Sequence, residues 1–377
     1  MEIFIKKGLP PMEIITTGKI FLKKLKHLPK HKLKERLLLG VKKYVQDYPY
    51  YISIQTVSAC NLKCKHCFIN DYQTHIHDGV TKIMKFDEFV LFAERLRPML
   101  KKASYITFST FEAIMNKNLF NMMDVILDIN PKMQFPFLSN TMLITQEKID
   151  MLSKYPVSEV NISLDGYTKK TVEDFKTEVV FEKIIETIKM FKQSPLKDKI
   201  AVTFVAHKNN IAELPEYVNF VHALGIKQIY VSNILTFTTE LAGLELYTKD
   251  GNAYAQQLFD QAIANAKHNG QIINMPRLKP EELGCQSTET FFIDINGNVA
   301  PCDFLGVTTP FTLWGNTVQN PPLIYGNILK EEPIAIYRKP EFKAFRKKHQ
   351  LGKDLPDVCK NCIDAYGLMC SNRIVNQ

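Results

Sequence analysis

The sequence lacks the features that carry a chain into or across a membrane. Its N-terminus has no short apolar block followed by a small-residue cleavage site, and no stretch of ~18 consecutive apolar residues occurs. We therefore expect neither a signal peptide nor a transmembrane segment, and we expect a cytoplasmic protein. A disulfide framework is not expected in that reducing compartment, so metal binding is the expected use of the eight cysteines.

Net charge is nearly absent beyond residue 50. Residues 1–50 hold twelve basic and four acidic side chains, and this accounts for +8 of the total charge of +9. Within this segment apolar residues repeat at helical spacing over 21–28, before Pro29, and lysines occupy the other face. The pattern predicts a basic N-terminal helical arm over 1–49. Such an arm could contact an anionic surface, or it could simply cover one end of the protein.

The remaining chain is long and apolar enough, at 377 residues and 45% hydrophobic content, for one large core and a smaller second domain. Its first part alternates strand-like and helix-like segments. The strands are predicted at 51–58, 105–109, 134–138, 157–164, 200–205 and 228–232, with helices at 86–100, 119–128, 146–154, 181–193 and 214–224. This alternation predicts an α/β fold, a partial (β/α)6 barrel over 50–250, with its chemistry at the carboxyl ends of the strands.

Three cysteines follow the first predicted strand in a C-x3-C-x2-C run, Cys60, Cys64 and Cys67. Iron–sulfur clusters are held by thiolates, usually four, so three thiolates leave one iron open to another ligand. A structural zinc site would require four Cys or His ligands, and His66 lies between two of the cysteines, where it is poorly placed to complete the set. The run favours an iron–sulfur cluster, with zinc as the alternative.

The run resembles the signature of the radical S-adenosylmethionine (SAM) enzymes. In that family the three cysteines bind a 4Fe-4S cluster, and the methionine end of SAM chelates the fourth iron. His66 stands where the family usually has an aromatic residue. The resemblance implies an enzyme that cleaves SAM reductively to an adenosyl radical, abstracts a hydrogen atom from a substrate, and receives electrons from a flavodoxin or ferredoxin-type donor.

Polar residues at later strand ends resemble the SAM contacts of this family. Glu112 stands where a glutamate receives the SAM ammonium, although the glycines and proline of that motif are replaced here. The Ser139-Asn140-Thr141 segment stands where Thr-Asn-Gly is frequent. Ser163 opens Ser-Leu-Asp-Gly, as in the SPASM branch, and Lys176 replaces an arginine that pairs with the SAM carboxylate. Without the resemblance, Glu112 would be an ordinary acid at a helix start.

The other five cysteines lie within 251–377, which we predict to be a second domain. Cys285 and Cys302 are separated by eleven residues, Gly297 and four more residues, and the intervening segment predicts a hairpin with an Asn-Gly turn. Cys359, Cys362 and Cys370 follow as C-x2-C-x7-C. This spacing resembles a SPASM domain, or the shortened twitch variant of it.

The cysteine count departs from the complete SPASM pattern, in which seven cysteines hold two auxiliary clusters. Five cysteines imply, by the resemblance, one auxiliary 4Fe-4S cluster. Cys285, Cys302, Cys359 and Cys362 are its first-choice ligands, and Cys370 replaces one of them or remains a buried thiol. Zinc is again the alternative.

An all-cysteine auxiliary cluster can accept the electron left on a substrate radical, which favours oxidation. Such an oxidation also requires a proton acceptor. Asp303 directly follows Cys302, where the sulfatase maturases of this family have an aspartate general base, and the resemblance implies that role. The alternative for Asp303 is a helix or turn cap. The enzyme class implied is a radical SAM oxidoreductase or maturase.

The substrate is predicted to be a ribosomal peptide. Only about 50 residues precede the barrel, so no fused leader-binding domain is expected, which leaves a separate leader-binding protein or recognition through the basic arm. A small-molecule substrate such as a cyclitol or sugar alcohol is the alternative, as for twitch dehydrogenases. A third alternative is a protein without radical chemistry, either an iron–sulfur or zinc scaffold or an electron carrier.

Overall fold

A computed structural model describes residues 48–67, 82–108, 111–237, 239–281, 284–285, 290–351 and 354–369. Nearly all of the predicted basic arm over 1–49 lies outside these ranges, and so does Cys370.

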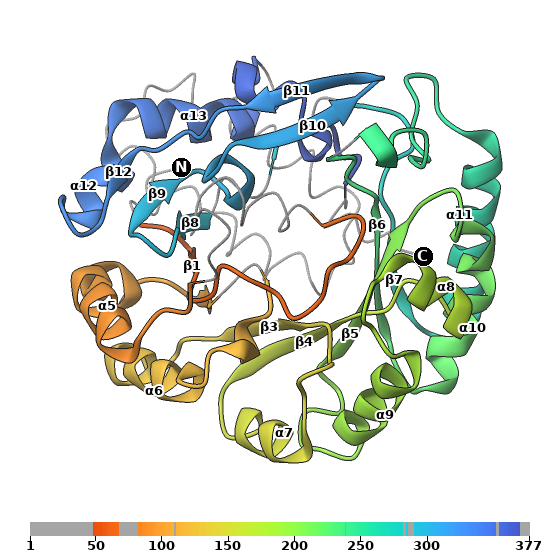
Figure 1. Ribbon diagram of the computed structural model, residues 1–377, viewed down its shortest axis with the longest axis horizontal. Helices are drawn as coiled ribbons and strands as arrows, with labels where there is room; N and C mark the ends of the chain where they lie inside the picture. The colour runs from red at the N-terminus through yellow and green to blue at the C-terminus, as the bar shows by residue number, and fades with distance from the viewer. Residues whose placement is uncertain are drawn as a thin grey trace, which may run out of the picture.

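A curved wall of parallel strands forms the centre of the protein, with helices on its outer side (Figure 1). The first six strands are β1 (Tyr51–Ile54), β2 (Tyr105–Thr107), β3 (Phe135–Ser139), β4 (Val157–Ser163), β5 (Ile200–Ala206) and β6 (Gln228–Asn233). Neighbours pair in parallel in chain order, and β2 joins β3 through a bridge between Tyr105 and Gln134. The predicted α/β partial barrel is confirmed.

The first strand is shorter than predicted. It ends at Ile54 instead of Ser58, because the backbone then leaves the ladder and bonds to two segments at once. The amide of Thr56 donates to the carbonyl of Phe108 at 2.8 Å, while its carbonyl accepts from the amide of Met84 at 2.9 Å. This irregular stretch positions the cysteine run above the end of β1.

The five helices predicted between the strands of the barrel are present, as α5 (Phe86–Leu100), α6 (Leu119–Ile129), α7 (Gln146–Leu152), α9 (Phe181–Lys192) and α10 (Leu214–Ala223). One more helix, α8 (Lys169–Phe175), was not predicted. It is seven residues long and largely polar, and it buries only Val172 and Phe175, so its apolar periodicity is too short to recognise. The side chain of Thr168 caps it by accepting from the amide of Thr171.

The barrel wall consists of two five-stranded sheets, one with β1 and β2 and the other with β3 to β6, and segments of the C-terminal half add strands to each. Helix α11 (Ala253–His268) packs against α10, and β7 (Ile272–Asn274) pairs in parallel with β6. At the other end, β8 (Thr290–Ile293) pairs in parallel with β1. The domain boundary at 250 remains a prediction, and strands from beyond it belong to the barrel wall.

The predicted hairpin around Gly297 is also present. It consists of β8 and β9 (Asn298–Ala300), and Gly297 in the turn has φ of +84°. Beyond it lie a second hairpin, β10 (Thr309–Leu313) with β11 (Asn316–Asn320), the short strand β12 (Gly326–Asn327), and the helices α12 (Pro333–Arg338) and α13 (Pro340–Leu351). No helix of the described residues combines the length and apolar character needed to span a membrane.

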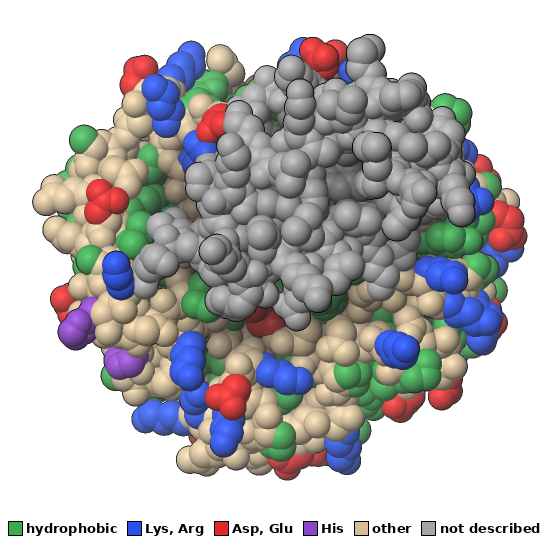
Figure 2. All heavy atoms as spheres, turned by 180° about the vertical axis from the view of Figure 1, so that it is seen from behind, with side chains coloured by type: hydrophobic (Ala, Val, Ile, Leu, Met, Phe, Trp, Pro, Cys, Tyr) green, Lys and Arg blue, Asp and Glu red, His purple; other side chains and the backbone are tan. Residues whose placement is uncertain are grey.

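The surface carries charges of both signs. Seen from behind in Figure 2, the Lys and Arg side chains of the described residues are interspersed with Asp and Glu. Neither sign dominates the visible described part of this face.

Candidate iron–sulfur and SAM site

The three cysteines of the C-x3-C-x2-C run lie in a tight loop directly above β1. The amide of Cys67 donates to the carbonyl of Cys64 at 3.1 Å, and Cys60, Cys64 and Cys67 are all half-buried. Lys65 fastens the loop to the end of α8, since its amide donates to the Phe175 carbonyl at 3.3 Å and its Nζ to the Asp174 carbonyl at 2.7 Å.

These three thiols suit a metal cluster. None of the seven cysteines in the described ranges forms a disulfide. Burial raises the pKa of Cys60 and raises that of Cys64 to about 12, so these groups stay protonated until a metal displaces their protons. Among the described residues, no three Cys, His, Asp or Glu side chains stand close enough to hold one single ion. A 4Fe-4S cluster takes one thiolate per iron, so its ligands stand further apart.

Glu112 lies beside the cysteine loop, at the centre of a hydrogen-bond group. Its side chain is 2% exposed, and its carboxylate accepts from Ser139 Oγ at 2.9 Å and from the Asn140 amide at 2.8 Å. Burial raises its pKa to about 7, against the lowering effect of those two bonds. Asn140 Nδ2 in turn donates to Asn61 Oδ1 at 2.9 Å and contacts Cys60 Sγ at 3.4 Å. The ends of β2 and β3 thus meet the cysteine loop.

Ser163 and Lys176 are also brought together, at the end of β4. Lys176 Nζ donates to Ser163 Oγ at 2.6 Å and forms an ion pair with Asp165 Oδ2 at 2.9 Å. Lys176 and Asp165 are 3% and 1% exposed. Burial is the largest influence on Asp165 and opposes its ionisation, but Lys176, together with His66 and the Val205 amide, lowers the net pKa. Sequence reasoning assigned no role to Asp165 and missed this ion pair.

A stack of aromatic rings connects the cysteine loop to the end of α8 and the end of β5, and sequence reasoning missed it as well. His66 stacks on Phe175 with ring centroids 5.0 Å apart, and His207, which follows β5, stacks on Phe175 at 4.1 Å. Burial lowers the pKa of both histidines to about 4, so both rings are neutral. The three residues are far apart in sequence, and no local pattern links them.

The second group of cysteines lines one cavity. Cys285, Cys302, Cys359 and Cys362 all border it, and it encloses about 430 Å³, including the open space at its mouth. Burial raises the pKa of all four thiols, most strongly for Cys285 and Cys302. Four cysteines are the number that a 4Fe-4S cluster needs, so the donor set fits the predicted auxiliary cluster.

Short turns and helix ends position these four thiols. The amide of Cys362 donates to the Cys359 carbonyl at 3.1 Å, which closes the C-x2-C turn, and Cys302 follows β9. Cys285 Sγ donates to Asp364 Oδ2 at 2.6 Å. Asp364 borders the same cavity and was not among the predicted site residues.

Asp303 begins a short 3-10 helix (Asp303–Leu305) directly after Cys302. Burial raises its pKa to about 6, against the lowering effect of backbone amides of residues 303 and 304. The carboxyl is therefore within reach of proton transfer near neutral pH. Its bonds to these amides also fit the alternative role of a turn cap.

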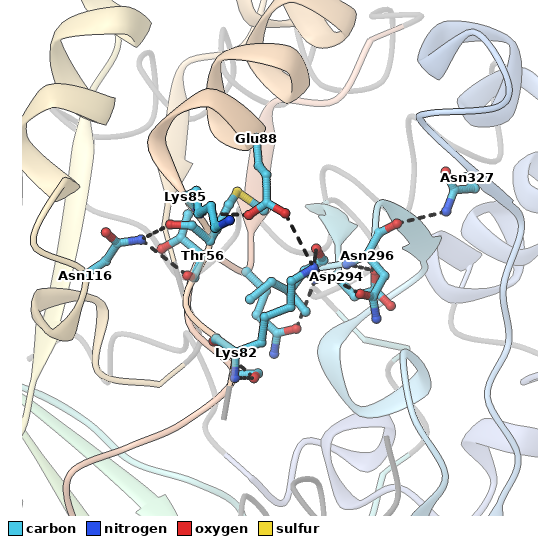
Figure 3. Close-up of polar contacts among 12 residues, drawn as sticks. Thr56, Lys82, Lys85, Glu88, Asn116, Asp294, Asn296 and Asn327 are labelled. Atoms are coloured by element: carbon cyan, nitrogen blue, oxygen red, sulfur yellow. Dashed lines mark hydrogen bonds and ion pairs between the residues drawn. The ribbon is translucent and has the colours of Figure 1, made fainter. Parts of the chain in front are cut away.

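Polar contacts connect the segments on either side of the first cysteine loop to neighbouring elements. Lys82 Nζ donates to the carbonyl of Ile295 and to Asn296 Oδ1, both at 3.3 Å, and lies 4.0 Å from Glu88 at the start of α5 (Figure 3). Asn116 Nδ2 donates to the carbonyl of Thr56 on the opposite side. The segment before the first cysteine loop is joined to the β8–β9 hairpin, which leads to Cys302, by Gln55. The Gln55 amide donates to the Ile293 carbonyl at 2.9 Å, and its side-chain oxygen accepts from the Ile295 amide at 3.2 Å.

Comparisons with known proteins agree with this arrangement. The chain matches the Radical SAM superfamily over residues 54–221 and the SPASM iron–sulfur cluster-binding domain over residues 285–363. It is 24% identical over 307 residues to the tungsten-containing aldehyde ferredoxin oxidoreductase cofactor-modifying protein of Pyrococcus furiosus, covering 78% of this chain and 83% of that protein. It is also 24% identical to a GTP 3',8-cyclase of Clostridium perfringens, over 46% of this chain and 51% of the cyclase.

Solved structures share the fold. The structure of anSMEcpe with bound SAM superposes with a TM-score of 0.62 at 18% identity, covering 85% of this chain and 89% of that one. Streptococcus suis SuiB bound to SAM gives a TM-score of 0.56 at 16% identity, covering 84% of this chain and 70% of that one.

A partial barrel with three cysteines above its first strand, and a separate cavity lined by four cysteines, is the arrangement expected of an iron–sulfur enzyme. The chain belongs to the radical SAM superfamily, in the branch that carries a SPASM domain. These two domains imply a SAM-binding 4Fe-4S cluster, auxiliary iron–sulfur chemistry and SAM itself as the cofactors.

Proposed function

We propose that this enzyme cleaves SAM reductively, removes a hydrogen atom from a ribosomal peptide and oxidises the peptide at that position. One observation carries the proposal. The residues predicted to bind SAM meet beside the three-cysteine loop, with Asn140 Nδ2 3.4 Å from Cys60 Sγ and Glu112 bonded to the amide of Asn140.

Each of these residues has a role that its surroundings support. Cys60, Cys64 and Cys67 hold the first cluster. Glu112 receives the SAM ammonium, while Ser139 and the amide of Asn140 hold the Glu112 carboxylate in place. Ser163 and Lys176 bind the carboxylate of SAM. When bound, the first cluster supplies the electron that splits SAM into methionine and an adenosyl radical, and the auxiliary cluster takes up the electron left on the substrate.

The oxidation balances if Asp303 acts as the proton acceptor. The substrate carbon loses a hydrogen atom to the adenosyl group, and the remaining substrate radical then loses one electron and one proton. The carboxylate of Asp303, which lies in the chain between the cavity-lining residues Cys302 and Phe304, takes the proton, which leaves a two-electron oxidised product. The net change is the loss of two hydrogens from the substrate.

Two partners belong to this proposal. A flavodoxin or ferredoxin-type protein supplies the reducing electron, and a separate leader-binding protein or the basic segment 1–50 recognises the peptide leader. A structure of Streptococcus suis SuiB with precursor peptide SuiA shows that a protein of this fold binds a peptide.

A small molecule is the second candidate substrate. The Pyrococcus furiosus relative, which this chain matches over most of its length, is named as a cofactor-modifying protein. This similarity favours a small cofactor or a polyol as the alternative to a peptide.

Anaerobic reconstitution tests the proposed function. The protein is loaded with iron and sulfide, then incubated with SAM and a strong reductant, and 5'-deoxyadenosine is measured. We expect about eight irons per chain and SAM cleavage. Zinc without iron, or a loaded protein that leaves SAM intact, contradicts the proposal.

Asp303→Asn tests the proton acceptor. The variant should still cleave SAM but form no oxidised product, because the substrate radical can no longer lose its proton. The product is detected by mass spectrometry as the loss of two hydrogens, with candidate peptides and polyols assayed in parallel to distinguish the two substrate classes. Unchanged product yield removes Asp303 from the mechanism.

A further inference from the structure

His349 lies in the last turn of α13 and borders the four-cysteine cavity. Its side chain is 2% exposed. Nδ1 of its ring accepts a hydrogen bond from the amide of Cys285 at 3.0 Å, so the imidazole directly holds the backbone of a predicted cluster ligand.

This hydrogen bond fixes the position of the ring proton. Because Nδ1 accepts, a neutral imidazole must carry its hydrogen on Nε2. Nε2 is buried and has no hydrogen-bond partner among the described residues. A buried donor without a partner destabilises the folded protein, so a group at this place in a native protein calls for an explanation.

Close contacts surround both the backbone and the ring of His349. Gly284 has φ of +73°, and a Cβ at that position would lie 1.9 Å from the His349 carbonyl oxygen, so the two backbones are in direct contact. Phe345 lies beside the imidazole, with ring centroids 4.8 Å apart. Residues 284–285 and the end of α13 therefore form one packed unit at the cavity wall.

We propose that His349 is a positioning residue for the auxiliary cluster, with Nδ1 anchoring Cys285 and Nε2–H donating to a sulfur atom of the bound cluster. This inference rests on the proposed function only in requiring that the four-cysteine cavity holds a 4Fe-4S cluster. Hydrogen bonds to cluster sulfurs stabilise the reduced, more negative state and raise the reduction potential. A higher potential suits a cluster that accepts an electron from a substrate radical.

Direct ligation of iron by His349 is a different role, and the geometry disfavours it. A neutral imidazole that binds iron through Nε2 carries its proton on Nδ1. That proton would point at the amide hydrogen of Cys285, from which Nδ1 accepts in this structure. The anchoring bond and neutral-imidazole ligation therefore exclude each other.

Two substitutions distinguish the roles of the two ring nitrogen atoms. In His349→Asn the amide oxygen takes the place of Nδ1, which keeps the acceptor for Cys285 and removes the donor. In His349→Gln the side-chain amide reaches the place of Nε2, which restores a donor. His268→Asn, in the exposed last turn of α11, is the matched control.

The experiment uses the full chain with Cys60, Cys64 and Cys67 changed to Ala, so that reconstitution loads the auxiliary site alone. The midpoint potential is measured by a redox titration followed by electron paramagnetic resonance. We expect His349→Asn to lower the midpoint potential by about 59 mV. For a one-electron couple this lowers the ratio of reduced to oxidised cluster about tenfold at a given potential. His349→Gln should recover much of this shift, and His268→Asn should cause none.

A second measurement decides the case even if the variants load poorly. The chain is labelled with ¹⁵N in its histidines, and every residue of the cavity is left unchanged. Pulsed electron paramagnetic resonance should then show the weak coupling of a hydrogen-bonded nitrogen. A strong coupling typical of a ligating nitrogen, no histidine coupling, or an unchanged potential in a loaded His349→Asn variant overturns the inference. The measurement needs no SAM, so failure of SAM cleavage would contradict the proposed function and leave this inference intact.

Discussion

Glu112 shows how burial prepares a side chain for a charged ligand. Its pKa of about 7 means that the carboxyl is only partly ionised near neutral pH, although Ser139 and the amide of Asn140 both donate to it. An ammonium group placed beside it would favour the ionised form and pull the pKa down.

We predict that Glu112→Gln weakens SAM binding about 10-fold or more, because a hydrogen bond to a charged group is worth about 1.5–3 kcal/mol. In the unchanged enzyme the affinity for SAM should fall as the pH drops below about 7, since Glu112 must then release a proton before it binds the ammonium. Glu112→Gln should lack this pH dependence, because glutamine has no proton to release. Calorimetric titration of SAM across the pH range measures both effects, with Glu147→Gln, at an exposed position of α7, as the control. Equal affinities for Glu112→Gln and the unchanged enzyme would refute the SAM contact.

His207 links the aromatic stack to the stability of the protein. Its side chain is 2% exposed, and burial lowers its pKa to about 4, while the nearby charge of Asp165 partly opposes this shift. Below pH 6.5 the unfolded chain binds a proton that the folded protein does not accept. The free energy of unfolding should therefore fall as the pH drops from about 6.5 to about 4, by up to about 3 kcal/mol from this residue.

His207→Asn tests that prediction. The asparagine oxygen can replace Nδ1, which accepts from the Asn209 amide at 3.3 Å, but it does not titrate. Urea unfolding at pH 7 and pH 4 should show a smaller loss of stability for the variant than for the unchanged protein. Parallel pH curves for the two proteins would contradict the assignment.

Helix α13 and the segment before Cys285 depend on one glycine. Gly284 combines a positive φ with a backbone contact that leaves no room for a methyl group. We predict that Gly284→Ala displaces Cys285 and reduces the iron content from about eight to about four per chain after reconstitution.

Gly315 provides the matched control for Gly284. It lies in the turn between β10 and β11 with φ of +78°, and nothing lies within 4 Å of an added Cβ. Gly315→Ala should therefore cost only the strain of the positive φ, about 1 kcal/mol, and keep full iron content. Full loading of Gly284→Ala would show that the contact with His349 does not position the cysteine.

The protein as a whole is expected to unfold as a unit because its C-terminal half completes the barrel. Strand β8 pairs with β1, and Phe291 on β8 is fully buried against Tyr337 and Phe342. We predict that Phe291→Ala lowers the free energy of unfolding by about 3–5 kcal/mol and speeds hydrogen exchange in β1. Mass-spectrometric exchange measures this, with Leu91→Ala at a half-exposed site of α5 as the control. Unchanged exchange in β1 would mean that the two halves open independently.

Much of the barrel could be predicted because its strands and helices are long and periodic. Helix α5 was predicted with its bounds, and β3 to β6 were each predicted to within about two residues. Helix α8 and strand β7 were missed because they are short, and β10 and β11 were missed as well. The parallel pairing of β8 with β1 was also missed, since nothing local marks a partner that lies more than 200 residues away.

The cysteine spacing and the residues at strand ends were sufficient to predict the class of enzyme and to nominate most of its candidate site, because ligand spacing and periodicity are local properties of a chain. The partners of those residues depended on packing. Lys176 meets Asp165, His66 and His207 meet Phe175, and Cys285 meets His349 and Asp364, all across separate elements. Such contacts form only when the barrel closes, because folding alone brings these distant residues within bonding distance and removes the water that would otherwise solvate them.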